Sequence, residues 1–207
     1  MERVDLAQWW GLAAALGLAS GVRLYAVLLV VGLAERFHWA ALPPAFAPLG
    51  HPFVLGAAAF MVLVELFADK VPVLDSAWDF LHTFVRIPAG AALAAAALGG
   101  TSSTWTLVAA ILGGSLAATS HFAKAGTRVA VNASPEPFSN LLVSTLEDVG
   151  VGALLWLALA HPWIALAVVA VLAVAALLLA RLVWKLVAGG VRRLFGRRVD
   201  APASPAR

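Results

Sequence analysis

Six long apolar runs, separated by short segments that break helices, constrain the fold of this 207-residue chain more than any other feature of its sequence. The runs are Leu6 to Ala34, Pro52 to Ala68, Ser76 to Leu98, Trp105 to Ala123, Phe138 to Ala160 and Pro162 to Val187. The segments between them, such as PPAFAPLGHP and NASPEP, have the composition of turns and helix ends. About 20 apolar residues in a helix cross the hydrocarbon core of a bilayer. The sequence therefore predicts an all-α, polytopic transmembrane bundle of about six spans.

The composition supports this class and leaves little room for anything else. Hydrophobic residues make up 62% of the chain, charged residues 12%, and the mean hydropathy is +0.93, whereas soluble domains are about half apolar and a quarter charged. We therefore expect residues 1–188 to form one transmembrane domain without a separate soluble domain. The chain has no Cys, which excludes disulfides, iron–sulfur clusters and thiol nucleophiles. No glycine-rich phosphate loop or dinucleotide fingerprint is present, so no cofactor is expected.

The first apolar run is too long for a helix that stands perpendicular to the membrane. At about 1.5 Å per residue it exceeds the hydrocarbon thickness. Ser20-Gly21 falls inside it, and Trp9 and Trp10 lie near its start. We expect this run to tilt, to begin as an interfacial helix anchored by the two Trp residues, or to break near Ser20-Gly21.

A basic segment at the end of the chain predicts the orientation. From Arg181 onward there are seven basic residues and one acidic residue, Asp200. Because Lys and Arg are retained on the cytoplasmic side, six spans would place both termini in the cytoplasm. Residues 189–207 are predicted to be a disordered tail that contacts anionic lipid. No nucleic-acid-binding motif is present, so nucleic acid is not expected as a partner.

Small residues are frequent within the apolar runs. Gly17 to Gly21 reads GLASG, a GxxxG pattern that lets helices approach closely in lipid. Such a pattern serves either close packing inside the bundle or contact between copies of the chain, and the sequence leaves both open.

A polar stripe interrupts the apolar pattern in the third run. Asp75, Asp79, His82 and Arg86 are separated by four, three and four residues, so on a helix they share one face. An ionisable group at the centre of a membrane helix costs at least about 2.5 to 3.5 kcal/mol, so such groups normally pair or line a wet cavity. This face is therefore expected to look away from lipid.

Further charged residues interrupt the other runs, mostly in the half expected to be cytoplasmic. We predict that they meet the stripe in one intramembrane site for an ion or substrate. The predicted site consists of Arg23, Glu65, Asp69, Asp75, Asp79, His82, Arg86, His121, Lys124, Arg128, Glu147 and Asp148.

The chemistry of such a site is open at the level of the sequence. Asp75, Asp79 and His82 could bind a divalent metal ion, although Arg86 would repel it. The basic members could instead bind an anion, or all the charges could form a purely structural network of ion pairs. No serine lies in a nucleophile motif, so the sequence does not favour an enzyme.

Three stretches, ELFADKVPVLDSAWD, HFAKAGTRVAVNASPEPFSN and STLED, occur in this order along the chain. Together they resemble a family of bacterial integral membrane proteins known as domain of unknown function 4126, over about residues 10 to 160. The resemblance implies a small protein of the bacterial inner membrane but no particular activity and no catalytic residues. The leading hypothesis is therefore a permease or channel-like transporter of an ion or small polar solute. A membrane enzyme acting at the lipid interface and a noncatalytic structural protein are the alternatives.

Overall fold

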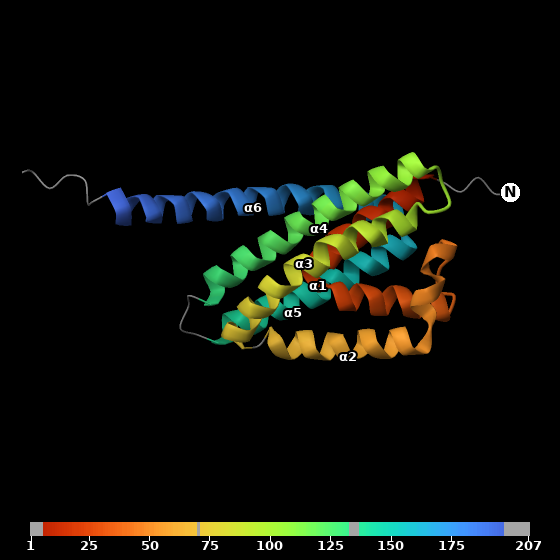
Figure 1. Cartoon of the computed structure of the whole chain (residues 1–207), viewed down its shortest axis with the longest axis horizontal. Helices are drawn as coiled ribbons and strands as arrows, with labels where there is room; N and C mark the ends of the chain where they lie inside the picture. The colour runs from red at the N-terminus through yellow and green to blue at the C-terminus, as the bar shows by residue number, and fades with distance from the viewer. Residues whose placement is uncertain (1–5, 70, 133–136, 197–207) are drawn as a thin grey trace, which may run out of the picture.

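The computed structural model describes residues 6–69, 71–132 and 137–196, and over these ranges the chain is helical and contains no strand (Figure 1). The elements in chain order are α1 (Leu6–Arg36), the 3-10 helix η1 (Pro44–Gly50), α2 (Pro52–Ala68), α3 (Pro72–Ala97), α4 (Ser103–Asn132), α5 (Pro137–Ala160) and α6 (Pro162–Gly196). The predicted all-α membrane bundle is confirmed. Five helices are long and apolar enough to cross a membrane, and η1 with α2, bent by 71°, form a sixth candidate span.

Helices α2, α3, α5 and α6 begin at prolines that follow the turn segments, and α3 begins four residues before the predicted run. Pro52 and Pro162 open α2 and α6, since proline at the first helical position lacks only an N–H that would have no partner there. At the start of α2, the Nδ1 atom of His51 also accepts a hydrogen bond from the backbone N–H of Phe53 at 3.4 Å. Local sequence thus determines where each helix starts.

The first helix is broken at Arg23, close to the predicted position at Ser20-Gly21. Arg23 has φ −143° and ψ 75°, which is not helical, and regular helix lies on both sides of it. In Figure 1 the part before Arg23 runs from the right end of the bundle to its middle, and the part after Arg23 runs back to the right.

Contacts at the two ends of α1 confirm that it folds back on itself. Gly11, near its start, lies directly against the backbone of Pro162 at the start of α6. A cavity at the same end is lined by Trp9, Pro162 and also by Leu42, which follows the end of α1. The helix is therefore a re-entrant hairpin, defined here as the α1 hairpin, with Arg23 at its tip.

This hairpin changes the topology that the sequence predicts. Helices α2 to α6 run from one end of the bundle to the other, whereas α1 enters and leaves at one end (Figure 1). The Gly11 end of α1 packs against the start of α6, and α6 has 35 residues, or about 50 Å of helix. The described chain thus begins and ends at opposite ends of the bundle, which differs from the expectation of both termini on one side.

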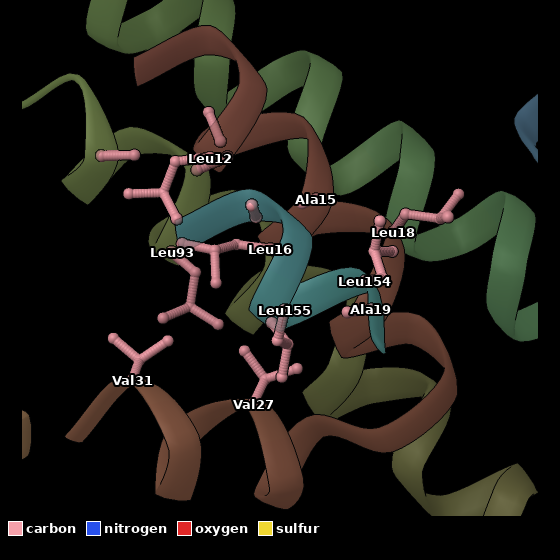
Figure 2. Packing of buried hydrophobic residues seen from close by; sticks show 14 of the residues in the cluster. Leu12, Ala15, Leu16, Leu18, Ala19, Val27, Val31, Leu93, Leu154 and Leu155 are labelled. Atoms are coloured by element: carbon pink, nitrogen blue, oxygen red, sulfur yellow. The ribbon is translucent and has the colours of Figure 1, made fainter. Parts of the chain in front are cut away.

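The hydrophobic core lies between the arms of the α1 hairpin and their neighbours. Leu12 and Leu16 of the first arm and Val27 and Val31 of the second arm belong to one buried cluster. In Figure 2 Leu154 and Leu155 of α5 and Leu93 of α3 lie with them, and Leu16 and Leu155 are at most 1% exposed.

Small residues bring α1 and α4 into close contact. A Cβ atom at Gly17 would stand 2.7 Å from the Cα atom of Gly113, and one at Gly21 would overlap the backbone of Ala117. The GLASG pattern is therefore occupied by packing within the chain.

The last helix extends beyond the rest of the bundle (Figure 1). It continues to Gly196, into the segment predicted to be a disordered tail. Apolar residues continue at helical spacing through Val187, Val191 and Leu194, which explains the extension. Arg181 and Lys185 of this helix are exposed, and the remaining tail, residues 197–207, lies outside the described residues.

Candidate functional site

Nine of the predicted site residues form one group at the tip of the α1 hairpin, and we call this group the charge network. They come from α1, from α3 to α5, and from the end of α2, and most of them are buried. The members are Arg23, Glu65, Asp69, Asp79, Arg86, Lys124, Arg128, Glu147 and Asp148.

Asp69, which follows the last residue of α2, pairs with three basic side chains of the network through one oxygen atom. Its Oδ2 atom pairs with the Nη1 atom of Arg23, with Lys124 Nζ at 3.3 Å and with Arg128 Nη2 at 3.5 Å. Its backbone carbonyl accepts a hydrogen bond from Asn140 Nδ2 at 3.0 Å. Burial alone would raise the pKa of the Asp69 carboxyl, but Lys124, Arg23 and Arg128 outweigh burial and hold that pKa below its usual value.

Arg86 connects the acidic residues of α2 and α3. Its Nη2 atom pairs with Glu65 Oε1, and its Nη1 atom donates to Asp79 Oδ1 at 2.8 Å. Asp79 and Arg86 are seven residues apart on α3, so the predicted shared face brings them together. Arg86 Nη1 also lies 3.4 Å from His121 Nδ1.

His121 lies between Arg86 and the polar residues of α3. Arg86 Nη1 is 3.4 Å from its Nδ1 atom. Its Nε2 atom bonds Thr83 Oγ1 at 2.7 Å, and the Thr83 hydroxyl donates to the backbone carbonyl of Asp79 at 3.0 Å. The imidazole thus joins Arg86 to the polar residues of α3.

The polar face of α5 completes the network on the other side. Glu147 Oε2 accepts from Arg128 Nη2 at 2.7 Å, and Asp148 Oδ1 pairs with Arg23 Nε at 2.8 Å. Arg23 also donates from Nη2 to Ser144 Oγ at 3.0 Å. Of these carboxylates Asp148 is the most exposed, with 37% of its side-chain surface accessible.

Lys124 lies between three carboxylates of the network and is not bound closely to any one of them. Its Nζ atom lies 3.3 Å from Asp69, 3.5 Å from Asp79 and 3.9 Å from Glu147. It also donates to the carbonyl oxygen of Val22 at 3.4 Å, in the turn just before the break in α1. A cation there stabilises the end of the first arm, whose last carbonyls have no helical partner.

The network holds more acids than bases. Its five carboxylates are Glu65, Asp69, Asp79, Glu147 and Asp148, and its four basic side chains are Arg23, Arg86, Lys124 and Arg128. With every group ionised, one negative charge is left over. A buried surplus of this kind favours uptake of a proton or a cation.

His82 lies beside the network and does not share its ion pairs. Its Nδ1 atom bonds the carbonyl of Trp78 at 2.9 Å, its Nε2 atom bonds the Tyr25 hydroxyl at 3.0 Å, and its ring stacks on Trp78. Both ring nitrogens are therefore engaged. The side chain of Asp75 lies outside the described part of the structure.

The predicted metal site, Asp75, Asp79 and His82, lies only partly in the part of the chain that the structure describes, because the side chain of Asp75 is outside it. Within that part no three His, Cys, Asp or Glu residues gather closely enough to hold a metal ion. To bind a metal there, His82 would have to give up its bond to Tyr25 or to the carbonyl of Trp78, since both of its ring nitrogens are engaged.

Sequence reasoning missed several polar residues of the site. Asn140 is buried, and its Oδ1 atom accepts from Arg128 Nη1 at 2.5 Å. Asn140, Ser144 and Glu147 are separated by four and three residues, the same spacing that revealed the stripe on α3. Counting amides and hydroxyls together with charges would have found this face.

Three buried serines of the bundle serve helix packing or the charge network. Ser20 donates to the carbonyl of Gly17 at 2.8 Å, and Ser120 donates to the carbonyl of Leu18 at 2.7 Å, across the α1–α4 contact. Ser144 accepts from Arg23. These bonds give no sign of an activated hydroxyl.

Comparison with known proteins assigns the chain to a family. The profile described as "Domain of unknown function (DUF4126)" matches residues 11–182. That match continues into α6, beyond residue 160 where the resemblance in the sequence was expected to end. No curated protein and no solved structure matches the chain. Because the profile covers most of the chain, including every residue of the charge network, the chain belongs to the DUF4126 family.

Proposed function

We propose that this protein is a small permease, and that the charge network is the site at which it exchanges protons or holds an ion or small polar solute during transport. The observation that carries the proposal is the break of α1 at Arg23, whose buried side chain reaches the network from the tip of the α1 hairpin. Broken helices at membrane depth are found where the irregular backbone is buried in protein or lines a cavity, and transporters build their binding sites from such helices.

Two properties of the network support exchange of a proton or cation. One carboxylate is in excess, so the network can accept a positive charge. Lys124 lies between three carboxylates at 3.3 to 3.9 Å, so a small shift of its side chain redistributes its pairing. A proton on Glu147 or Asp79 would release Lys124 toward Asp69.

We further propose that the end of the bundle with the charge network faces the cytoplasm. Arg181, at the end of the candidate span Pro162–Leu182, and Lys185, just after it, are exposed on α6, and basic residues next to a span are retained on the cytoplasmic side. The same residues suit anionic lipid headgroups. The α1 hairpin then enters from the opposite side of what we take to be a bacterial inner membrane.

Flux into liposomes tests the transport proposal. The full chain is reconstituted with a pH-sensitive dye inside, and a panel of cations, anions and small polar solutes is applied with and without a pH gradient. We expect flux of at least one solute or of protons by the parent chain. Glu147→Gln should abolish it in a folded protein, because the amide keeps the shape of Glu147 and removes its charge and proton. Arg36→Ala, at the exposed end of the hairpin, is the matched control and should transport normally.

A structural role is the second candidate, favoured by the pairing of every basic member with at least two acceptors. A parent chain that moves nothing across the panel would favour it. Parental flux in folded Glu147→Gln would limit the structural role to the charge network, in a protein that still transports.

A further inference from the structure

A pocket of about 220 Å³ opens between α3 and α4, on the outside of the bundle and beside the charge network. Its inner lining includes Asp79, Thr83, His121 and Arg128. Its rim is formed by exposed apolar side chains, among them Phe80. The pocket is smaller than typical sites for drug-sized ligands, which occupy about 300 to 1,000 Å³. It therefore suits the polar head of a ligand whose remainder stays outside.

The position of the pocket indicates where such a ligand comes from. Val129, which lines the pocket, is the last residue of the apolar span in α4. Phe122 lies about two helical turns before Val129 on α4, and it is also exposed at the rim. In a membrane the opening thus faces lipid near the border between acyl chains and headgroups. An amphiphile could place its head in the pocket and leave its hydrocarbon chain in the bilayer.

The hydrogen bonds of the lining residues show what the head must offer. Thr83 already donates to a backbone carbonyl and bonds His121, and the second nitrogen of His121 is held by Arg86. Asp79 differs from them. Its Oδ1 atom pairs with Arg86, but its buried Oδ2 atom has no hydrogen-bond partner among the described residues. A buried acceptor without a donor is costly, so a ligand that donates to Asp79 is favoured.

The charges around Asp79 argue for a neutral donor. Arg86 at 2.8 Å and Lys124 at 3.5 Å already compensate this carboxylate, and Arg128 lines the same pocket. A cationic head would meet these three basic groups, whereas an anionic head would meet the carboxylate itself. A hydroxyl group avoids both repulsions and still donates a hydrogen bond.

We propose that the pocket between α3 and α4 binds the hydroxyl head of a neutral membrane amphiphile, such as a diacylglycerol or a long-chain alcohol, with the Asp79 carboxylate as the acceptor. The pocket shares Asp79 and Arg128 with the charge network, but binding from the bilayer requires no passage across it, so this proposal and the transport proposal can fail independently.

Equilibrium binding of radiolabelled 1,2-dioctanoylglycerol to the purified full chain tests the proposal by scintillation proximity. The competitors are unlabelled dioctanoylglycerol, its methyl ether, the corresponding primary amine and dioctanoyl phosphatidic acid. We expect saturable binding, and competition by the methyl ether that is about tenfold or more weaker than by the alcohol, because a hydrogen bond to a charged acceptor is lost. Equal competition by the ether, or stronger competition by the amine or the phosphate, would overturn the proposal, and so would the lack of saturable binding.

A pair of variants places the binding in this pocket. Ala125→Leu fills the pocket from α4 without changing a charge and should reduce binding by about tenfold or more. Ala92→Leu, at an exposed position of α3 outside the pocket, is the matched control and should bind like the parent. Parental binding by Ala125→Leu would remove the pocket from the proposal. Since the comparison of alcohol and ether uses the parent chain, it stands even if Ala125→Leu fails to fold.

Discussion

Around the arms of the α1 hairpin the bundle is packed from Leu, Val, Ala and Gly, whereas around its tip it is connected by ion pairs among five helices. In the apolar half each contact is small, and a lost methyl group leaves its neighbours intact. In the charged half each group satisfies several others, so that removing one leaves buried charges without compensation. The two halves should therefore respond very differently to substitution, and α1 belongs to both.

The largest expected effect tests the dependence of the charged half on Asp69. Asp69→Ala removes the shared partner of three basic side chains and should lower the free energy of unfolding by about 3 to 5 kcal/mol, measured by SDS titration in mixed micelles. Arg36→Ala, a charge deletion at the exposed end of α1, should change stability little. Similar stabilities for both variants would show that the network is not the interdependent unit described above.

Acid should remove part of the same stabilisation. Because the pKa of Asp69 is lower in the folded chain than the unfolded value of about 4, its contribution is complete above that value and is lost as the pH falls through the folded pKa. The melting temperature of the parent in detergent should thus drop in strongly acidic buffer. Asp69→Asn should show a shallower decrease over the same range, since the amide does not titrate. If the melting temperatures of the parent and of Asp69→Asn fell in parallel as the pH is lowered, the acid effect would not come from Asp69.

The apolar half should be most sensitive where helices touch without side chains. Gly17→Val places a branched side chain against the backbone of Gly113 and should destabilise the chain by about 1 to 3 kcal/mol, because α1 and α4 must move apart. Gly56 of α2 has open space around it, so Gly56→Val is the control and should not be destabilising in this way. The same SDS titration measures both, and an equal loss in the two variants would exclude close α1–α4 packing as the cause.

Prediction from the sequence succeeded where local chemistry decides the outcome. Apolar runs and prolines located the helices, and the spacing of Asp79 and Arg86 placed them on one face with a common ion pair. His82, between them in the sequence, lies far enough around the helix to reach Tyr25 instead. Residues that share one face of a helix by their spacing can still point toward different neighbours, so spacing alone did not separate His82 from Asp79 and Arg86.

The course of α1 could not be predicted in the same way. A long apolar run is compatible with a tilted crossing and with a hairpin, since both bury the same residues. The direction after Arg23 is decided by contacts far apart in the sequence, such as Gly11 with Pro162 and Lys124 with the Val22 carbonyl. Asn140 was missed for a different reason, because an uncharged amide does not stand out in an apolar run as an ionisable residue does.

The smallest expected effect lies at the solvent-facing edge of the charged half. Asp148 pairs with Arg23 at 2.8 Å, but more than a third of its side chain is exposed, so water screens the pair. Arg23 also keeps Asp69 and Ser144 when Asp148 is changed. Asp148→Asn should therefore lower the free energy of unfolding by no more than about 1 kcal/mol, well below the effect of Asp69→Ala in the same titration. Equal losses for the two variants would mean that the network has no exposed edge and that each of its carboxylates is as essential as Asp69.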